Sequence, residues 1–325
     1  MSRILVVAPN WIGDCVMAQP LFARLHAKLG QVRLDALARP SVAPVLRRMP
    51  EVAEVIEAPF RPGRLELKGR WRLGRQLRAR AYALAIVLPN SWKSALVPFF
   101  AEIPLRAGYV GESRYALLNV VHRERGERRP EPERYAALAE SPGEPPAQPL
   151  AQPRLVVREA EARATVRRFG LPERYAALCP GAEYGPAKRW PHYPALAERL
   201  DAPAVLLGSA RDRPAAAAVR AIDLTGRTTL DEAIDILALA EFAVTNDSGL
   251  MHVAAALDVP LVALYGSSSP RRTPPRGARA RTVWLGLPCS PCFARDCPLG
   301  HTACLRDIGP ERVLAELRDL RPGAH

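Results

Sequence analysis

Four short loops combine glycine, carboxylate and lysine residues directly after apolar segments that are typical of buried strands. They are NWIGD (10–14), PNSWKS (89–94), PGAEYGPAKRWP (180–191) and NDSGLMH (246–252). Loops that follow parallel strands open at the carboxyl edge of the sheet, where α/β proteins bind their ligands. Glycine lets a ligand approach the backbone, lysine offers a compact positive charge, and a carboxylate accepts a proton. These loops are therefore the candidate site.

The fourth loop has the signature of an anion site. Asp247 or Ser248 is a good N-cap, and the residues after Gly249 continue as a helix. The unpaired amides of the first helical turn, from Ser248, Gly249 and Leu250, could hold a pyrophosphate. An ordinary capped helix has the same signature, so this loop alone does not separate the two interpretations.

Lysine is scarce in this chain, and its placement is informative. Only four of the 46 basic residues are lysines, and Lys93 and Lys188 lie in the second and third loops. Lys188 and Arg189 come just before Pro191, which is well placed as the first residue of a helix. Cations at that end oppose the helix dipole, a cost that a bound anion would remove. The same reasoning applies to Lys93; the alternative is that each side chain points into water.

The first loop offers Gly13 and Asp14, but neither a three-glycine dinucleotide fingerprint nor the lysine of a phosphate loop. Asp14 could serve as a helix N-cap, the commonest role of an aspartate after a strand. It could also act as a base, because the helix dipole favours its charged form and a carboxylate can accept a proton from an attacking hydroxyl. The two roles are compatible.

The cysteines are unevenly distributed. Cys15 and Cys179 are isolated, as expected of core thiols, whereas four others form a C-x2-C-x4-C-x6-C cluster near His301: Cys289, Cys292, Cys297 and Cys304. This spacing permits a structural zinc site, although it matches no common ribbon or knuckle, so the absence of metal is equally compatible. Disulfides are not expected in a cytoplasmic chain.

Alternating strand and helix patterns predict an α/β protein with two Rossmann-like domains, each built on a parallel sheet. Strands are expected at 4–8, 32–38, 52–56, 83–88, 175–181, 204–208, 242–246 and 260–266, and helices at 16–29, 41–48, 71–80, 193–200, 229–240 and 310–321. Residues 141–153 hold five prolines and suit a linker. We therefore expect domains at 1–153 and 154–325 with a cleft between them, and a last helix that could pack on either.

The chain is strongly basic, with a net charge of +13, and the excess is concentrated in its first half. Residues 1–150 carry a net charge of +9, and segment 61–80 has eight cations and one acid. Such a face attracts nucleic acid, an anionic membrane or a phosphorylated ligand, unless it is simply a solvated helix. Nucleic-acid binding is disfavoured, because aromatic residues make up only 6% and no basic stretch interleaves them as stacking platforms.

Two further classes of protein are disfavoured, because the sequence lacks the motif or the segment that each would need. A nucleotide-dependent oxidoreductase would need the missing glycine fingerprint. A membrane-spanning protein would need an uncharged run of about 18 residues, and no such run occurs. The N-terminal apolar stretch is interrupted too early for a secretory signal, so we expect a cytoplasmic protein.

Taken together, these loops resemble those of the ADP-heptose–lipopolysaccharide heptosyltransferases, glycosyltransferase family 9. The resembling stretches are PNWIGDCVMAQPLF (9–22), LPNSWKSALVPFF (88–100), CPGAEYGPAKRWPHYP (179–194), LLGSARD (206–212) and TNDSGLMHVAAALDVPLVALYGSSSP (245–270). The resemblance implies a glycosyltransferase B architecture. It also implies an inverting transfer of L-glycero-D-manno-heptose from ADP-heptose to the first heptose of the lipopolysaccharide inner core. Transfer to Kdo or to a later heptose is the alternative within the family.

The resemblance also assigns roles. Asp14 would be the general base, and Gly13, Lys93 and Ser94 would face the acceptor in the N-terminal domain. The donor would be held in the C-terminal domain by these residues: Lys188, Arg189, Asp247, Ser248, Gly249 and Leu250, with Ser209 and Gly226–Thr229 near the adenine. No metal cofactor would be required. The acceptor would be a phosphorylated lipid A–core, which implies peripheral contact with the inner face of the inner membrane.

Overall fold

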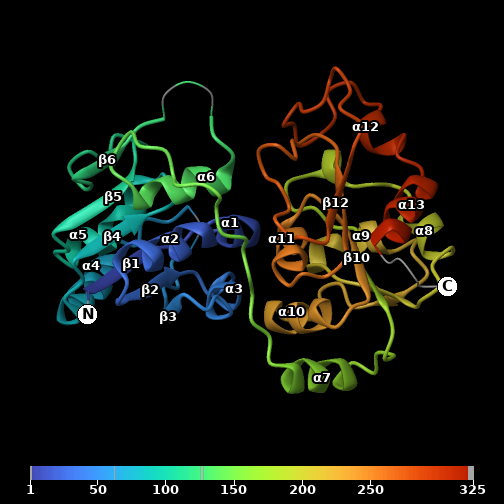
Figure 1. Ribbon diagram of the computed structural model, residues 1–325, viewed down its shortest axis with the longest axis horizontal. Helices are drawn as coiled ribbons and strands as arrows, with labels where there is room; N and C mark the ends of the chain where they lie inside the picture. The colour runs from blue at the N-terminus through green and yellow to red at the C-terminus, as the bar shows by residue number, and fades with distance from the viewer. Residues whose placement is uncertain (1, 62, 125, 127, 321–325) are drawn as a thin grey trace. The chain divides into compact units, whose positions relative to one another are not determined.

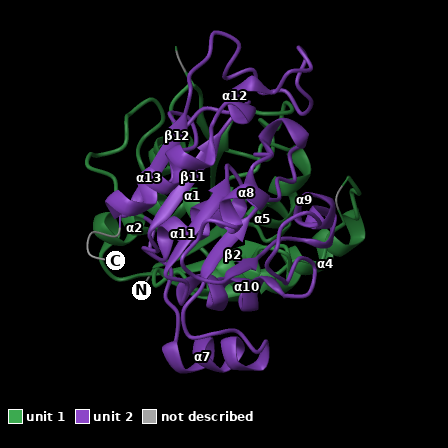
Figure 2. Cartoon of the chain, turned by 90° about the vertical axis from the view of Figure 1, so that its right-hand side faces the viewer, with its two compact units in different colours: residues 1–152 green, residues 153–325 purple. Residues whose placement is uncertain are grey.

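The computed structural model describes residues 2–320 except 62, 125 and 127 (Figure 1). The chain forms two compact units, Met1–Gln152 and Pro153–His325 (Figure 2). The division falls at the end of the proline-rich segment, one residue from the predicted boundary. All residues of 141–153 are described, and they form neither helix nor strand.

The N-terminal unit alternates strands with mostly short helices. Its strands are β1 (Ser2–Val7), β2 (Val32–Ala38), β3 (Val52–Glu57), β4 (Leu84–Val87), β5 (Leu105–Tyr109) and β6 (Val120–His122). Its helices are α1 (Ile12–Met17), α2 (Gln19–Leu29), α3 (Ala43–Arg47), α4 (Leu67–Leu77), α5 (Leu96–Phe100) and α6 (Glu131–Ala136), with 3-10 turns η1 (Arg78–Arg80), η2 (Trp92–Ala95) and η3 (Ala137–Ala139).

The C-terminal unit repeats this alternation. Its strands are β7 (Ala176–Cys179), β8 (Ala204–Leu206), β9 (Ile222–Asp223), β10 (Phe242–Asn246), β11 (Leu261–Tyr265) and β12 (Ala280–Trp284). Its helices are α7 (Glu159–Arg168), α8 (Tyr193–Ala197), α9 (Arg213–Ala216), α10 (Leu230–Ala238), α11 (Gly249–Ala256), α12 (Ala303–Arg306) and α13 (Pro310–Leu320), with 3-10 turns η4 (Pro186–Lys188) and η5 (Ala210–Asp212).

Both sheets have the same topology. The strand orders are β3-β2-β1-β4-β5-β6 and, read from the opposite edge, β9-β8-β7-β10-β11-β12. Every strand pairing in the described chain is parallel. In each sheet the chain builds outward from its first strand to one edge and then crosses to the other side. The predicted α/β class with two parallel Rossmann-like sheets is confirmed.

Differences from the predicted elements are local. Strands β5, β6, β9 and β12 were not predicted, because they are short or carry mixed polar residues at or near sheet edges. The segment predicted as one helix, 16–29, contains the end of α1 and all of α2, and Ala18 separates the two helices. The prediction that Pro191 begins a helix is wrong: α8 starts at Tyr193, with His192 as its N-cap and a proline at its second position.

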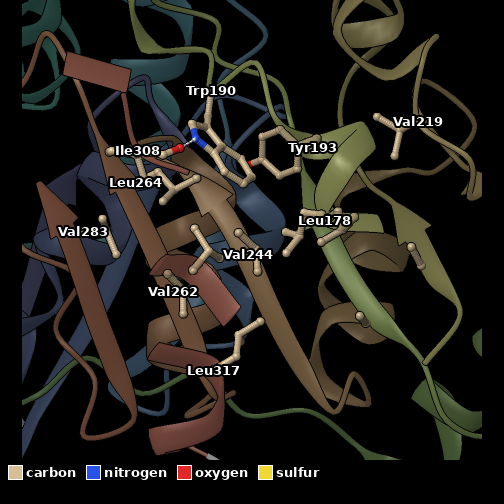
Figure 3. Packing of buried hydrophobic residues seen from close by; sticks show 14 of the residues in the cluster. Leu178, Trp190, Tyr193, Val219, Val244, Val262, Leu264, Val283, Ile308 and Leu317 are labelled. Atoms are coloured by element: carbon tan, nitrogen blue, oxygen red, sulfur yellow. Dashed lines mark hydrogen bonds between the residues drawn. The ribbon is translucent and has the colours of Figure 1, made fainter. Parts of the chain in front are cut away.

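A hydrophobic core in the C-terminal unit anchors the loop that carries Lys188 (Figure 3). Trp190 is buried, and its indole Nε1 donates a hydrogen bond to the Ile308 carbonyl oxygen at 2.8 Å. Its ring meets the Tyr193 ring edge to face. Helix α13 packs on β11, β12 and α8, so the last helix belongs to this unit.

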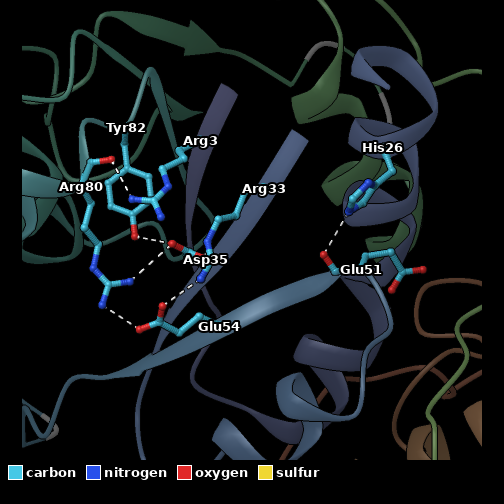
Figure 4. A network of polar contacts seen from close by, with 8 residues as sticks. All are labelled: Arg3, His26, Arg33, Asp35, Glu51, Glu54, Arg80 and Tyr82. Carbon is cyan, nitrogen blue, oxygen red and sulfur yellow. Dashed lines mark hydrogen bonds and ion pairs between the residues drawn. The ribbon is translucent and has the colours of Figure 1, made fainter. Parts of the chain in front are cut away.

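A charged network crosses the N-terminal sheet (Figure 4). Asp35 of β2 is fully buried and accepts hydrogen bonds from Tyr82 Oη at 2.7 Å and Arg33 Nε at 3.1 Å. Arg33 and Arg80 each form an ion pair with Glu54 of β3, at 3.0 and 2.7 Å. The network therefore ties β2 and β3 to the segment that leads into β4.

None of the helices in the described part of the chain is long and apolar enough to cross a membrane.

Candidate functional site

The four predicted loops flank the two positions where the strand order reverses. NWIGD follows β1 and PNSWKS follows β4, and these strands are neighbours with Val7 in register with Val87. Likewise, 180–191 follows β7 and 246–252 follows β10, where Cys179 is in register with Thr245. At such a reversal the adjacent loops lead away in opposite directions and leave a crevice in which α/β proteins bind ligands. Each unit therefore has one such reversal, and we refer to the region between its two loops as the crevice of that unit.

In the C-terminal unit, Lys188 and Asp247 meet across the crevice. The Lys188 ammonium lies 2.5 Å from Asp247 Oδ2, and both side chains are largely buried. Ser268, in the loop after β11, donates its hydroxyl to the same carboxylate oxygen. The ammonium also lies 5.0 Å from the centre of the Tyr184 ring. An ammonium has three donors, so the ion pair leaves Lys188 able to contact an anion as well.

Asn246 holds this arrangement in place. Its side chain is completely buried; Nδ2 donates to the Pro180 carbonyl oxygen at 2.7 Å, and Oδ1 accepts from the Trp190 amide at 3.1 Å. One amide thus connects the end of β10 to both ends of the 180–191 loop. Because Trp190 is fixed in the core, the backbone of Lys188 is fixed two residues away.

Helix α11 begins beside the ion pair. Ser248 is its N-cap in an extended conformation, and Gly249 is its first helical residue. The first amides of a helix have no partner within the helix, and those of α11 follow directly after Asp247. His252, one turn further on, is buried, and burial lowers its pKa to about 4. Asp247 raises that pKa and Lys188 lowers it, both by less than burial does. The imidazole is therefore neutral at pH 7.

The remaining predicted donor residues lie in the same unit. The Nε of Arg189 is buried without a hydrogen-bond partner among the described residues. The argument that a helix dipole opposes Lys188 and Arg189 is wrong: Lys188 closes the short turn η4, α8 begins five residues later, and the counter-charge of Lys188 is Asp247.

The two stretches predicted near the adenine lie side by side. The Gly226 amide donates to the Gly208 carbonyl oxygen at 2.8 Å, and a Cβ on Gly226 would lie 2.6 Å from Ala210 Cα. Gly226 also has a φ of +67°, so glycine is required there for both reasons. A capping box starts η5, with the Ser209 amide donating to Asp212 Oδ2 at 2.8 Å, and the Ser209 hydroxyl donates to the same oxygen at 2.8 Å.

In the N-terminal unit, Asp14 lies in the first turn of α1. The N-cap is Trp11, so the interpretation of Asp14 as N-cap is wrong. Gly13 is buried and Asp14 is half-buried. Burial raises the pKa values of Cys15 and Tyr135, and the Asp14 charge raises both further. These neighbours stay protonated at neutral pH, so neither is itself a candidate base.

The second loop is held by its own side chains. Ser94 Oγ donates to the carbonyl oxygens of Ser91 at 2.5 Å and Pro89 at 3.1 Å, which gives this hydroxyl a structural role. The Lys93 carbonyl accepts a hydrogen bond from Arg70 of α4 at 3.1 Å. The Lys93 side chain is half-buried, and no described residue pairs with its ammonium.

The cysteine cluster shows no formed metal centre. Among the described residues, no group of three or more histidine, cysteine, aspartate or glutamate side chains is arranged to hold a metal ion. All six cysteines are free thiols; Cys304 is buried and Cys292 exposed. Backbone hydrogen bonds, chiefly from Thr302, lower the pKa of Cys297. The zinc site stays a prediction.

Three residues of the C-terminal crevice were missed from the sequence: Asn246, His252 and Ser268. Asn246 and His252 belong to the recognised loop, but their types gave no reason to separate them from an ordinary helix start. Ser268 lies in the run Ser267–Ser269, which follows an apolar strand as the four other loops do, so the same rule could have found it. A cleft shared by the two units stays a prediction.

Comparisons with known proteins identify the family. The family model for glycosyltransferase family 9 (heptosyltransferase) matches residues 70–303. Lipopolysaccharide heptosyltransferase 2 of Escherichia coli is 46% identical over 341 residues, covering 98% of each chain. Lipooligosaccharide heptosyltransferase 2 of Haemophilus influenzae is 41% identical over 347 residues, covering 98% of this chain and 99% of that one.

Solved structures agree with this assignment. The structure of E. coli ADP-heptose lps heptosyltransferase II superposes with a TM-score of 0.86 at 44% identity, covering 98% of both chains. The E. coli heptosyltransferase WaaC with ADP has a TM-score of 0.72 at 21% identity, covering 98% of this chain and 99% of that one, a likeness of fold. With its two parallel sheets and their repeated topology, the chain therefore belongs to glycosyltransferase family 9, the heptosyltransferases, and is a glycosyltransferase of the glycosyltransferase B fold.

Proposed function

We propose that this enzyme transfers L-glycero-D-manno-heptose from ADP-heptose to the first heptose of the lipopolysaccharide inner core, with inversion. The full-length relatives named heptosyltransferase 2 support the acceptor, and the solved relative from E. coli, an ADP-heptose lps heptosyltransferase, supports the donor. Kdo or a later heptose as acceptor is not favoured by these relatives.

The Lys188–Asp247 pair beside the start of α11 carries the donor half of this proposal. When the glycosidic C–O bond to ADP breaks, its electron pair stays on the diphosphate, and the developing charge must be stabilised. Lys188, Arg189 and the amides of Ser248, Gly249 and Leu250 supply that stabilisation in a largely buried site. Asp247 orients the ammonium and lies beside the donor sugar.

The acceptor half depends on Asp14. The acceptor hydroxyl oxygen attacks the anomeric carbon, and its proton passes to the Asp14 carboxylate as the new C–O bond forms. This single displacement needs one base and no enzyme nucleophile. Lys93 provides a charge for a phosphorylated acceptor, and Gly13 leaves room beside the base. Ser94 acts by shaping this loop, and Ser209 with Gly226 by shaping the adenine-binding loops.

We further propose that the enzyme works in the cytoplasm at the inner face of the inner membrane, where its acceptor, a phosphorylated lipid A–core, is embedded. The net charge of +9 on residues 1–150 favours approach to such an anionic surface. No nucleic-acid partner is proposed.

Mass spectrometry of the reaction products tests this function. The purified enzyme is incubated with ADP-heptose and one of three truncated cores: one ending in Kdo, one ending in the first heptose, and one already carrying the second. We expect addition of one heptose only to the core that ends in the first heptose. Addition to the Kdo core, or to the core that already carries the second heptose, would contradict the assigned acceptor.

A further inference from the structure

Helix α4 presents an unusual combination of exposed apolar and basic side chains. Leu67 is 48% exposed and Trp71 is 51% exposed, and Leu65, just before the helix, is 38% exposed. Leu67 and Trp71 are four residues apart and therefore neighbours on one flank of the helix. Exposed aromatic and leucine side chains grouped in this way indicate a surface that meets another apolar medium.

The cations of α4 lie next to this apolar flank. Lys68, Arg72 and Arg75 are exposed, and the Arg75 guanidinium lies 5.9 Å from the centre of the Trp71 ring. In the described chain no carboxylate forms an ion pair with any of these three cations. Helix α7 of the other unit differs, because its Arg163 is paired with Glu159 at 2.7 Å. The positive charge of α4 is therefore available to an external anion.

The opposite face of α4 fixes the helix to the fold. Arg70, Gly74 and Leu77 are buried, and a Cβ on Gly74 would lie 2.5 Å from Phe100 Cβ, so α4 and α5 pack in close contact. Arg70 donates to the carbonyl oxygens of Leu65 at 2.7 Å and Lys93 at 3.1 Å, and it stacks on Phe60 at 4.2 Å. The exposed flank is thereby held outward and connected to the loop of Lys93.

We propose that α4 and the described residues of segment 61–66 form a docking surface for an anionic phospholipid bilayer, defined by Leu65, Leu67, Lys68, Trp71, Arg72 and Arg75. Tryptophan favours the boundary between headgroups and acyl chains, and unpaired lysine and arginine bind anionic headgroups. A short amphipathic helix with both features lies in the plane of the interface. This inference deepens the proposed function, because it places the Lys93 loop beside the membrane that holds the acceptor.

Vesicle sedimentation tests the docking surface without requiring turnover. The full chain is mixed with vesicles of phosphatidylethanolamine containing phosphatidylglycerol, or with phosphatidylcholine vesicles, and no acceptor is added. We expect binding to the anionic vesicles only. The double variant Lys68→Glu/Arg72→Glu should lower the binding constant roughly tenfold or more, and Trp71→Ala about fivefold. Arg163→Glu/Arg167→Glu on α7 is the matched control, with the same change in charge, and should bind as the wild type does.

A second readout separates lipid docking from acceptor recognition. With a deacylated, water-soluble core that keeps its phosphates, kcat/KM of the α4 variants should equal that of the wild type. Failure of the wild type to bind anionic vesicles, or unchanged binding by the α4 variants, would overturn the proposal. So would α4 variants that lose kcat/KM on the soluble acceptor while their vesicle binding stays intact, because that result would assign these cations to the acceptor site. Binding to duplex DNA in place of vesicles would assign the surface to nucleic acid. A wild type that binds anionic vesicles but shows no turnover on any core would count against the proposed function and not against docking.

Discussion

Lys188 and Asp247 form an ion pair in the structure, and this pairing explains how a carboxylate could belong to the proposed site for a negatively charged donor. Alone, Asp247 would repel a diphosphate; paired at 2.5 Å, it sets the position of the ammonium that attracts one. The sequence predicted both residues because each lies in a loop after a strand. It could not predict the pairing, because 59 residues separate them and the contact depends on the register of β7 and β10.

Replacing Lys188 by alanine should weaken ADP binding about 10- to 100-fold, because a charge-assisted hydrogen bond is lost and the buried Asp247 charge is left facing the diphosphate. Isothermal titration calorimetry with ADP measures this directly. Lys93→Ala removes the lysine of the other loop and should leave ADP affinity unchanged. Equal affinity of Lys188→Ala and the wild type would remove Lys188 from the donor site.

His252 makes the stability of the C-terminal unit depend on pH. Its folded pKa of about 4 lies below the ordinary value of 6.5, so folding favours the neutral form. The stabilisation is therefore complete above about pH 6.5 and is lost as the pH falls toward 4, by up to about 3 kcal/mol. Thermal unfolding followed from pH 7 to 4 should show this loss, and His252→Gln should flatten the profile. If the stability of the wild type and of His252→Gln falls equally with decreasing pH, other titratable groups cause the loss.

Among the elements, those with strong local patterns were predictable and those defined by tertiary contacts were not. Strands β1, β2, β10 and β11 are mostly apolar and buried, and they were expected within a few residues of their observed bounds. Strand β9 has only two residues, and it exists because Ile222 pairs with Val205 of β8. The helix expected at 71–80 begins at Leu67, after Glu66 adopts a left-handed conformation that no local pattern announces.

Asp35 illustrates a buried charge that holds several elements together. Asp35→Ala would leave Tyr82 and the nearby guanidinium groups without their shared acceptor, and it should lower the free energy of unfolding by about 3–5 kcal/mol. Tyr82→Phe removes one hydrogen bond and should cost about 1 kcal/mol. Urea unfolding of the two variants measures the difference. Equal, small losses would mean that the network of Figure 4 contributes little to the N-terminal unit.

The cysteine segment makes a separate prediction. If Cys289, Cys292, Cys297 and Cys304 bind zinc, the metal is structural and pins the segment between β12 and α12. Elemental analysis of the purified chain should then find about one zinc per chain, and Cys297→Ser should lower this occupancy and the thermal midpoint together. Cys15→Ser changes an isolated buried thiol and should leave the metal content unchanged. A metal-free wild type with an unchanged melting profile after chelation would remove the zinc from the account.

At the scale of the molecule, one topology occurs twice, and each copy has a crevice where its strand order reverses. The proposed chemistry divides between them. The C-terminal crevice supplies positive charge and helix amides for a leaving diphosphate, and the N-terminal crevice supplies a carboxylate for the incoming hydroxyl. Residue types and their positions after strands predicted the four loops, and the resemblance to the heptosyltransferases assigned them to donor and acceptor. The internal bonds of Ser94 and Ser209 were not predictable, because a hydroxyl can bind a ligand or its own backbone equally well.

The most direct test of this division is to measure turnover and donor binding on the same variant, Asp14→Asn. Loss of the base should lower kcat by about 10²- to 10⁴-fold, while the dissociation constant for ADP stays within about twofold of the wild type because the donor groups lie in the other unit. An unchanged melting temperature shows that the variant is folded. A kcat near that of the wild type would contradict the account at its centre, and so would a loss of ADP affinity that matches the loss of rate.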